Sequence, residues 1–249
     1  MSQISRAPAK VFYRMAIWLF QATIANAEIH GTLTGTTNYV YKMYSKSNNG
    51  PAIQANLDYQ HSSGFYAGAS VSSFNIGRSE VNEDFHFPNQ ARAEITPYLG
   101  WSFNLNKDWR FDAQYNRFFY DNRVYEFSGD YNEYYLFLHY KDIVTANVSF
   151  TEDFYGIGDF AVFYELTGRY PITDFLEFSS TFGYGQTKFV LFDDYPYWNA
   201  GLTGRYKFIA LDLRYYDAKE IHFPHPSGQQ PNHPDKLTAT VVFTISVGY

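Results

Sequence analysis

The chain has 249 residues, no cysteine and a formal net charge of −6 at pH 7. Without cysteine it can form neither disulfides nor thiolate metal sites, and it has no cysteine nucleophile. Aromatic residues make up 21% of the sequence, although the mean hydropathy is −0.36. That combination is expected of a membrane β-barrel, in which aromatic girdles and an apolar outer face accompany a polar interior.

Residues 1–27 have the features of a secretory signal. Arg6, Lys10 and Arg14 precede a short apolar segment, and Ala25-Asn26-Ala27 is a small-x-small cleavage site. The apolar segment is too short for a membrane helix, which needs about 20 residues. We therefore expect an exported mature chain of residues 28–249. Removing the three basic leader residues from 19 leaves 16 against 25 acidic side chains, which argues against nucleic acid as a partner.

After the leader, apolar and polar residues alternate in runs that predict β-strands. The first run lies near 29–43, and later runs begin at 53, 65, 93, 109, 131, 144, 160, 176, 197 and 209. The connections switch regularly between long loops and short turns. Long loops are predicted at 44–50, 77–92, 120–130, 151–159, 185–196 and 217–235. Short turns are predicted at 60–64, 104–108, 141–143, 171–175 and 207–208.

The last strand, residues 237–249, has the clearest pattern. Apolar residues occupy every second position from Leu237 to Tyr249, and the other face is mostly Thr, Ser and Gly. One face therefore suits lipid and the other suits water, as in a transmembrane β-barrel strand. A soluble edge strand could alternate in the same way, but it would rarely run for about thirteen residues.

The turn lengths support the predicted facing of the strands. Outward positions keep the same parity across an odd-length turn and change parity across an even-length turn, and all five short turns obey this rule. The sequence thus predicts an all-β fold, a transmembrane antiparallel barrel of about twelve strands with short periplasmic turns and long extracellular loops. Pro97 lacks a ladder donor, which predicts either a bulge or a local misassignment in the strand that contains it.

The same parity places charged residues inside the barrel. The candidate pore-lining residues are Lys42, Asp58, Glu94, Arg110, Asp112, Glu133, Glu165, Arg169, Glu177, Arg205, Asp212 and Arg214. A charged ring at a constriction would select ions by sign. Interleaved opposite charges could instead pair and fill the lumen. We expect a narrow pore, partly occluded by an inward loop such as 77–92, with a weak preference for cations because seven acids face five bases.

Other chemistry has weaker support. His86, His222, His225 and His233 lie in predicted loops and could bind a divalent metal, but their spacing matches no zinc pattern. A lipid-directed hydrolase would need Ser, His and Asp or Asn together at the membrane rim. His139 is a candidate base, but it is predicted to face the lumen beside tyrosines. Tyr98, Tyr135 and Phe137 are also predicted to face inward, too few for a sugar-binding aromatic track.

Several stretches carry a resemblance to a known family. These are Asn38-Tyr39-Val40-Tyr41, Pro51-Ala-Ile-Gln54 with Leu57-Asp58-Tyr59, Gly64-Phe-Tyr-Ala-Gly68, Asp130-Tyr-Asn-Glu133-Tyr and Val241-Val-Phe-Thr-Ile-Ser. On these residues the mature chain resembles the exported bacterial Gcw_chp proteins, also known as TorF-type porins. The family's first strand continues with an Arg-Gly pair where this chain has Lys42-Met43. The resemblance implies an outer-membrane barrel and a pore, and it implies no substrate.

The predicted function is therefore a passive outer-membrane channel for small hydrophilic solutes or ions, without a cofactor and without enzymatic activity. The alternative is a non-conducting structural or surface-interaction barrel whose lumen is plugged by its own side chains. The expected partners are outer-membrane lipids and the barrel-assembly machinery, which would read the C-terminal strand ending in Tyr249.

Overall fold

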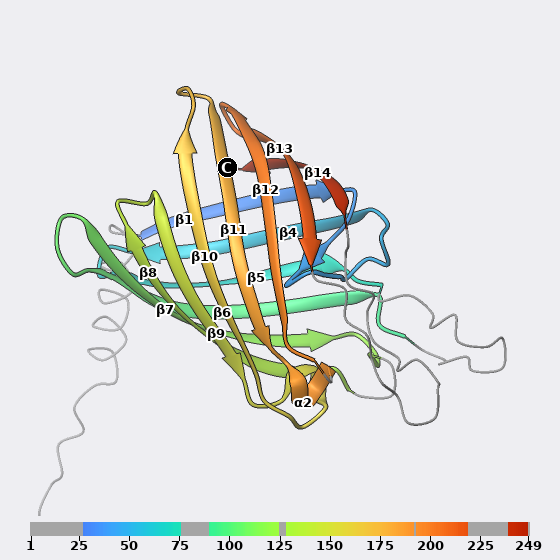
Figure 1. The fold of residues 1–249 in the computed structure, drawn as a ribbon. Helices are drawn as coiled ribbons and strands as arrows, with labels where there is room; N and C mark the ends of the chain where they lie inside the picture. The colour runs from blue at the N-terminus through green and yellow to red at the C-terminus, as the bar shows by residue number, and fades with distance from the viewer. Residues whose placement is uncertain (1–26, 76–89, 125–127, 192, 219–238, 249) are drawn as a thin grey trace, which may run out of the picture.

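A computed structural model describes residues 27–75, 90–124, 128–191, 193–218 and 239–248. Twelve antiparallel strands close into one barrel, in which the last strand, β14, pairs with the first, β1 (Figure 1). The strands are β1 (Ala27–Thr36), β4 (Ala52–His61), β5 (Phe65–Ser73), β6 (Ala93–Asn104), β7 (Trp109–Tyr120), β8 (Tyr131–Tyr140), β9 (Val144–Thr151), β10 (Ala161–Pro171), β11 (Leu176–Gln186), β12 (Tyr195–Tyr206), β13 (Ile209–Ala218) and β14 (Thr240–Gly248). In these described ranges, no helix has the length and apolar character needed to cross a membrane.

The two ends of the barrel differ, as the sequence predicts. The five short turns lie at one end, which we call the turn rim, and the longer connections lie at the other end, the loop rim. The loop rim carries a single turn of 3₁₀-helix, η1 (Phe154–Gly156), and the short helix α2 (Lys188–Leu191). β1 begins and β14 ends at the turn rim, because Ala27 pairs with His61 and Gly248 donates to Phe208. The predicted fold class and strand number are confirmed.

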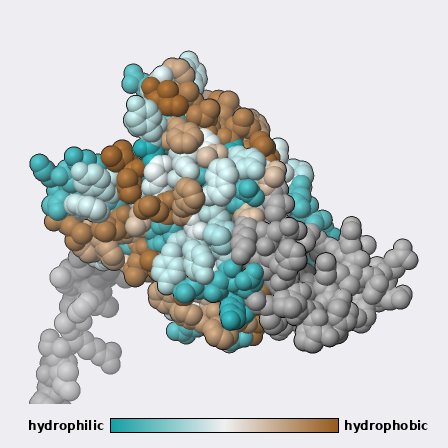
Figure 2. Space-filling model, in the orientation of Figure 1, coloured by the Kyte–Doolittle hydropathy of each residue, from teal (hydrophilic) through white to brown (hydrophobic). Residues whose placement is uncertain are grey.

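The alternating pattern separates an apolar outer face from a polar inner face. Outward side chains such as Leu57, Leu166 and Val241 are 60%, 55% and 60% exposed, which in water would be costly over so large an area. Figure 2 shows hydrophobic side chains gathered on the strands away from α2. Aromatic residues lie outward near the rims, among them Trp101, Tyr140, Tyr170 and Tyr206, where rings anchor a barrel at the bilayer interface.

The predicted bulge at Pro97 is wrong. Tyr98 pairs with Asn116 and Ile95 with Phe119, so the register between β6 and β7 is the same on both sides of the proline. On the other side, Pro97 itself pairs with Ala69 in an unbroken register with β5. The strand tolerates the missing donor without inserting a residue.

Inward tyrosines lie over cross-strand glycines. Tyr197 pairs with Gly183, and a Cβ on this glycine would lie 2.1 Å from the Tyr197 ring. Tyr66 and Tyr98 cover Gly100 and Gly68 in the same way, at 2.3 and 2.5 Å. A ring that covers a glycine restores packing where the strand has no side chain. These pairs fix the inward tyrosines flat against the wall.

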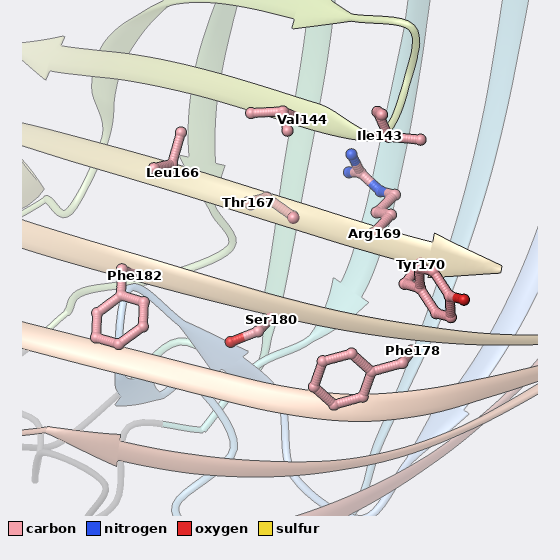
Figure 3. A pocket seen from close by; sticks show the side chains of 10 residues that line it. Ile143, Val144, Leu166, Thr167, Arg169, Tyr170, Phe178, Ser180 and Phe182 are labelled. Carbon is pink, nitrogen blue, oxygen red and sulfur yellow. The ribbon is translucent and has the colours of Figure 1, made fainter. Parts of the chain in front are cut away.

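A shallow groove of about 440 Å³ interrupts the outer face at β10 and β11 (Figure 3). It lies at Gly168, where a Cβ would meet nothing within 4 Å. Leu166 pairs with Phe182 on one side of Gly168, and Tyr170 pairs with Phe178 on the other. The groove is lined mainly by apolar side chains, so it belongs to the lipid-facing surface.

Candidate functional site

The first connection of the barrel does not extend outward as a loop. β1 ends at Thr36, not near 43 as predicted, and the chain turns into the lumen as a hairpin of β2 (Val40–Tyr41) and β3 (Tyr44–Ser45). Lys42 and Met43 form its tip with φ of 47° and 68°, a left-handed turn that an alternation pattern cannot reveal. We call residues 38–50 the lumen hairpin. The predicted inward loop, 77–92, lies mostly outside the described residues.

The base of the lumen hairpin is fixed by its own polar residues. Ser45 Oγ donates to Asn38 Oδ1 at 2.7 Å, and the Tyr39 N–H donates to Ser47 Oγ at 2.8 Å. Ser47 Oγ in turn donates to the Gly50 carbonyl at 2.6 Å. Asn38, Ser45 and Ser47 are all buried, so these bonds form away from water. The hairpin therefore has a defined conformation of its own.

Lys46 joins the hairpin to β6. Its side chain is fully buried, and its Nζ lies 2.6 Å from Glu94 Oε2. Glu94 also accepts hydrogen bonds from the Tyr39 hydroxyl at 2.8 Å and the Tyr120 hydroxyl at 2.7 Å. The ammonium lies 4.0 Å from the centre of the Tyr41 ring. A buried carboxylate with three donors is well compensated, whereas the same carboxylate without the lysine would not be.

Lys42 makes the second buried ion pair, with Glu133 on β8. The Tyr41 hydroxyl also donates to Glu133, and Lys42 Nζ donates to Ser149 Oγ on β9 at 2.8 Å. The Tyr195 hydroxyl donates to the Lys42 carbonyl at 2.8 Å. The tip of the hairpin is thus bonded to β8, β9 and β12. Because β9 lies across the barrel from β1 and β4, to which the hairpin is joined, the hairpin spans the lumen.

Aromatic residues fill the space around the hairpin in the loop half of the barrel. The buried rings are Tyr44, Phe74, Phe118, Tyr131, Phe154, Tyr155, Phe163, Tyr195 and Tyr197. Several of them face inward at the loop ends of strands. They lie an even number of positions from an inward charged residue on the same strand, so the alternation pattern could have identified them. The sequence prediction named Tyr98, Tyr135 and Phe137 only, and so missed most of the inward aromatic residues.

The turn half of the lumen is hollow, with a recess on each of two opposite walls. One recess, about 430 Å³, is lined by β4 to β7 and includes Asp58, Asp112 and Arg110. The Tyr66 hydroxyl donates to Asp112 at 2.5 Å, and the Asn56 and Gln60 amides donate to Asp58 at 3.1 and 3.3 Å. We call this the acidic wall, because two acids share one arginine, which lies 4.0 Å from Asp112 and donates to Asp142 in the adjoining turn at 2.7 Å.

The other recess, about 350 Å³, is lined by β10 to β13. Arg214 bonds Asp212 and Ser179, Arg205 lies 3.6 Å from Glu177, and Arg169 donates to Thr145 at 2.9 Å. We call this the basic wall. In the closed strand order β12 and β6 are six places apart among twelve, so the two walls face each other across the lumen.

The structure places the twelve predicted pore-lining residues inside the barrel, eleven of them in three groups. Lys42, Glu94 and Glu133 hold the lumen hairpin, with Lys42 carried by the hairpin instead of by a strand. Asp58, Arg110 and Asp112 belong to the acidic wall, and Arg169, Glu177, Arg205, Asp212 and Arg214 to the basic wall. Glu165 lies between the hairpin and the basic wall, where it accepts bonds from Tyr197 and Asn147 at 2.8 and 2.9 Å. Lys46 was not predicted, because it was assigned to an external loop.

The histidine predictions fall in two groups. His86, His222, His225 and His233 lie outside the described residues, as does Tyr249. In the described part of the chain, no three His, Asp or Glu side chains are grouped closely enough to hold a metal ion. His139 lies in the lumen, where its Nδ1 is 3.0 Å from Thr145 Oγ1.

At the turn rim the charges are exposed and paired. Asp142, in the turn between β8 and β9, accepts a hydrogen bond from Arg110, which holds the pKa of that carboxyl below its ordinary value. Such exposed pairs contribute little to stability. Among the charged residues, removal of one partner should therefore affect stability most at the buried ion pairs of the hairpin.

A closed twelve-stranded barrel with an apolar outside, a polar inside and an inward-folded loop defines an outer-membrane-type β-barrel. The chain belongs to the Gcw_chp family, described as a bacterial protein of unknown function, which matches residues 22–247. The predicted resemblance is confirmed. No curated protein matches the chain.

Solved channels share this fold. The KdgM porin in complex with disordered oligogalacturonate superposes with a TM-score of 0.51 at 7% identity, covering 89% of this chain and 98% of that chain. The NanC porin gives 0.52 at 12% identity, with 88% and 98% covered. A mutant of the TodX monoaromatic hydrocarbon channel gives 0.53 at 11% identity, with 90% of each chain covered. At these identities the likeness establishes the barrel fold.

Proposed function

We propose that this protein is a passive outer-membrane channel for small hydrophilic solutes, closed in its loop half by the lumen hairpin. The observation that carries the proposal is the hollow, polar turn half of a closed barrel, with charged recesses of about 430 and 350 Å³. A barrel that served only as a scaffold could fill this volume with apolar side chains, as small barrels do.

The hairpin gives the channel a gate. It is bonded to the wall by two buried ion pairs and by tyrosine hydroxyls, but its two ends join β1 and β4 without any covalent link to the opposite wall. Solutes would pass when it leaves the lumen or shifts within it. We place the turn rim in the periplasm and the loop rim outside the cell, with residues 1–27 removed on export.

A second candidate, a barrel that never conducts, is favoured by the same hairpin. Two buried ion pairs and a surrounding aromatic cluster could hold it in place permanently. In that case the loop rim, and not the lumen, would carry the function. The two candidates differ in whether solute crosses the folded protein.

Liposome swelling separates them. Vesicles containing the purified mature protein are placed in isotonic arabinose, sucrose or raffinose, and the rate of swelling is read by turbidity. A matched variant replaces residues 39–46 with a Gly-Ser linker of equal length. The channel proposal expects swelling that falls with sugar size and is much faster for the linker variant. If the unaltered protein admits no arabinose although it is folded and inserted, the non-conducting candidate is correct, whether or not the linker variant swells.

A further inference from the structure

The basic wall has an uneven distribution of partners among its three arginines. Arg214 is bound on several sides: its guanidinium donates to Asp212, to Asn199 Oδ1 at 2.8 Å and to Ser179 Oγ at 2.8 Å. Its side chain is only 14% exposed. Arg214 and Asp212 therefore form a neutral, fixed unit of the wall, and Arg214 has little capacity to bind a solute.

Arg205 and Arg169 are different. Arg205 is 56% exposed, and its nearest carboxylate, Glu177, is 3.6 Å away. The Arg169 guanidinium donates to one hydroxyl, that of Thr145. Over the described ranges, Arg169 has no carboxylate within 4.0 Å, so its charge is not balanced by an ion pair. With three arginines against Glu177 and Asp212, the recess has a net charge of +1 and two guanidinium groups with donors to spare.

The opposite wall strengthens this asymmetry. Asp58 and Asp112 lie on the acidic wall, and Arg110 beside them is shared between Asp112, at 4.0 Å, and Asp142, at 2.7 Å. An anion in the turn half of the lumen is thus repelled from one side and attracted to the other. Since the walls are diametrically opposed, the field runs across the lumen and directs an anion into the recess.

The remaining lining of the recess suits an organic anion. The recess also contains the Asn199 amide and three threonine hydroxyls: those of Thr167 and Thr181 bond each other at 2.8 Å, and that of Thr203 donates to Asp212 at 2.7 Å. Asn199 Oδ1 is taken by Arg214, so its amide nitrogen is the group left to donate. Guanidinium groups bind carboxylates through paired hydrogen bonds, and hydroxyl and amide groups bind the hydroxyls of a polyol.

We propose that the basic wall is a binding site for a small hydroxylated carboxylate, whose negative charge is attracted by Arg205 and Arg169. The inference rests on the proposed channel function and names the solute class that the channel would favour. The proposed anion site differs from the weak cation preference that a count of charges predicts. Glu94 and Glu133 are paired with lysines of the hairpin, and Glu177 and Asp212 are paired with arginines, so four of the seven inward acids are neutralised.

Saturation-transfer NMR on the folded protein in detergent tests the site. The probes are gluconate and sorbitol, which have the same carbon number and differ in the carboxylate. We expect gluconate to bind and sorbitol not to bind. Arg169→Gln and Arg205→Gln should each weaken gluconate binding about fivefold or more, and the double variant at least tenfold. Lys207→Gln removes one positive charge in the adjacent turn, outside the lumen, and should change the affinity less than twofold.

Equal binding of gluconate and sorbitol, or unchanged affinity in the double variant, would overturn the proposal, as would no gluconate binding to the unaltered protein. If the double variant fails to fold, the exposed Arg205→Gln alone decides. The outcome is independent of the channel test. Swelling without gluconate binding overturns the anion site only, whereas gluconate binding without swelling overturns the channel and leaves the site.

Discussion

Removing the Lys46 ammonium should release the lumen hairpin. Lys46 and Glu94 are 0% and 2% exposed and 2.6 Å apart, and breaking such a buried pair by removing one partner costs about 3–5 kcal/mol. In Lys46→Met the side chain keeps its packing on Tyr41 and Phe118, and Glu94 keeps two hydroxyl donors. We therefore expect the lower value, about 3 kcal/mol. At about 1.4 kcal/mol per factor of ten, the opening equilibrium should rise roughly a hundredfold.

Hydrogen exchange read by mass spectrometry measures this equilibrium directly, because the amides of residues 39–47 exchange when the hairpin opens. In Lys46→Met their protection should fall roughly a hundredfold while peptides from β10 to β13 stay unchanged. The control, Lys141→Met, removes an exposed lysine that lies 3.7 Å from Asp108 and should leave the hairpin protected. Adding Glu94→Gln to Lys46→Met should restore part of the protection, since both charges are then gone.

Unchanged protection of residues 39–47 in a folded Lys46→Met barrel would refute the reasoning. It would mean that the aromatic packing alone holds the hairpin. A loss of protection in the double variant as large as in the single one would show that the buried carboxylate does not cause the effect.

Three further predictions concern the wall. Leu57→Arg places a charge on the lipid face and should lower the free energy of unfolding in lipid vesicles by about 2–4 kcal/mol. Asn56→Arg, which places the same charge in the lumen, should lower it much less. Equal losses in the two variants would contradict the assignment of Leu57 to the lipid face and Asn56 to the lumen. Gly183→Ala should destabilise the barrel by about 1–3 kcal/mol because its Cβ displaces the Tyr197 ring, while Gly168→Ala, which meets open space, should have little effect in the same urea titration. The pKa of Asp142 should lie below its usual 3.8 in a carboxyl NMR titration and return toward it in Arg110→Gln; because the folded pKa is the lowered one, the small stabilisation is present above pH 3.8 and is lost as the pH falls through the folded value.

The strand pattern was predictable because it repeats at every second residue. The length of each short turn also gives an independent test of which positions face outward. The two-residue turn Lys207-Phe208 changes parity between Tyr206 and Ile209, and the structure pairs those two residues. The lipid and lumen faces follow from that alternation. Pro97 misled the prediction, since a missing donor does not by itself change the register.

The lumen hairpin was not predictable from alternation. Lys42 and Met43 continue the alternation of the first strand, but they adopt positive φ and turn the chain inward. What decides this is contact with Glu94 and Glu133, which lie 48 and 91 positions further along the chain. The neutral pairing of Arg214 with Asp212 was likewise hidden from a count of charges, and the weak cation preference stays a prediction.

Single-channel conductance in a planar bilayer tests the central claim most directly, with the mature protein and the variant that carries a Gly-Ser linker at 39–46. We predict brief, infrequent steps for the unaltered protein and long-lived open steps of discrete size for the variant, because the hollow turn half then meets an open loop half. A silent variant, shown to be folded and inserted, would contradict the claim that the hairpin is what closes this barrel.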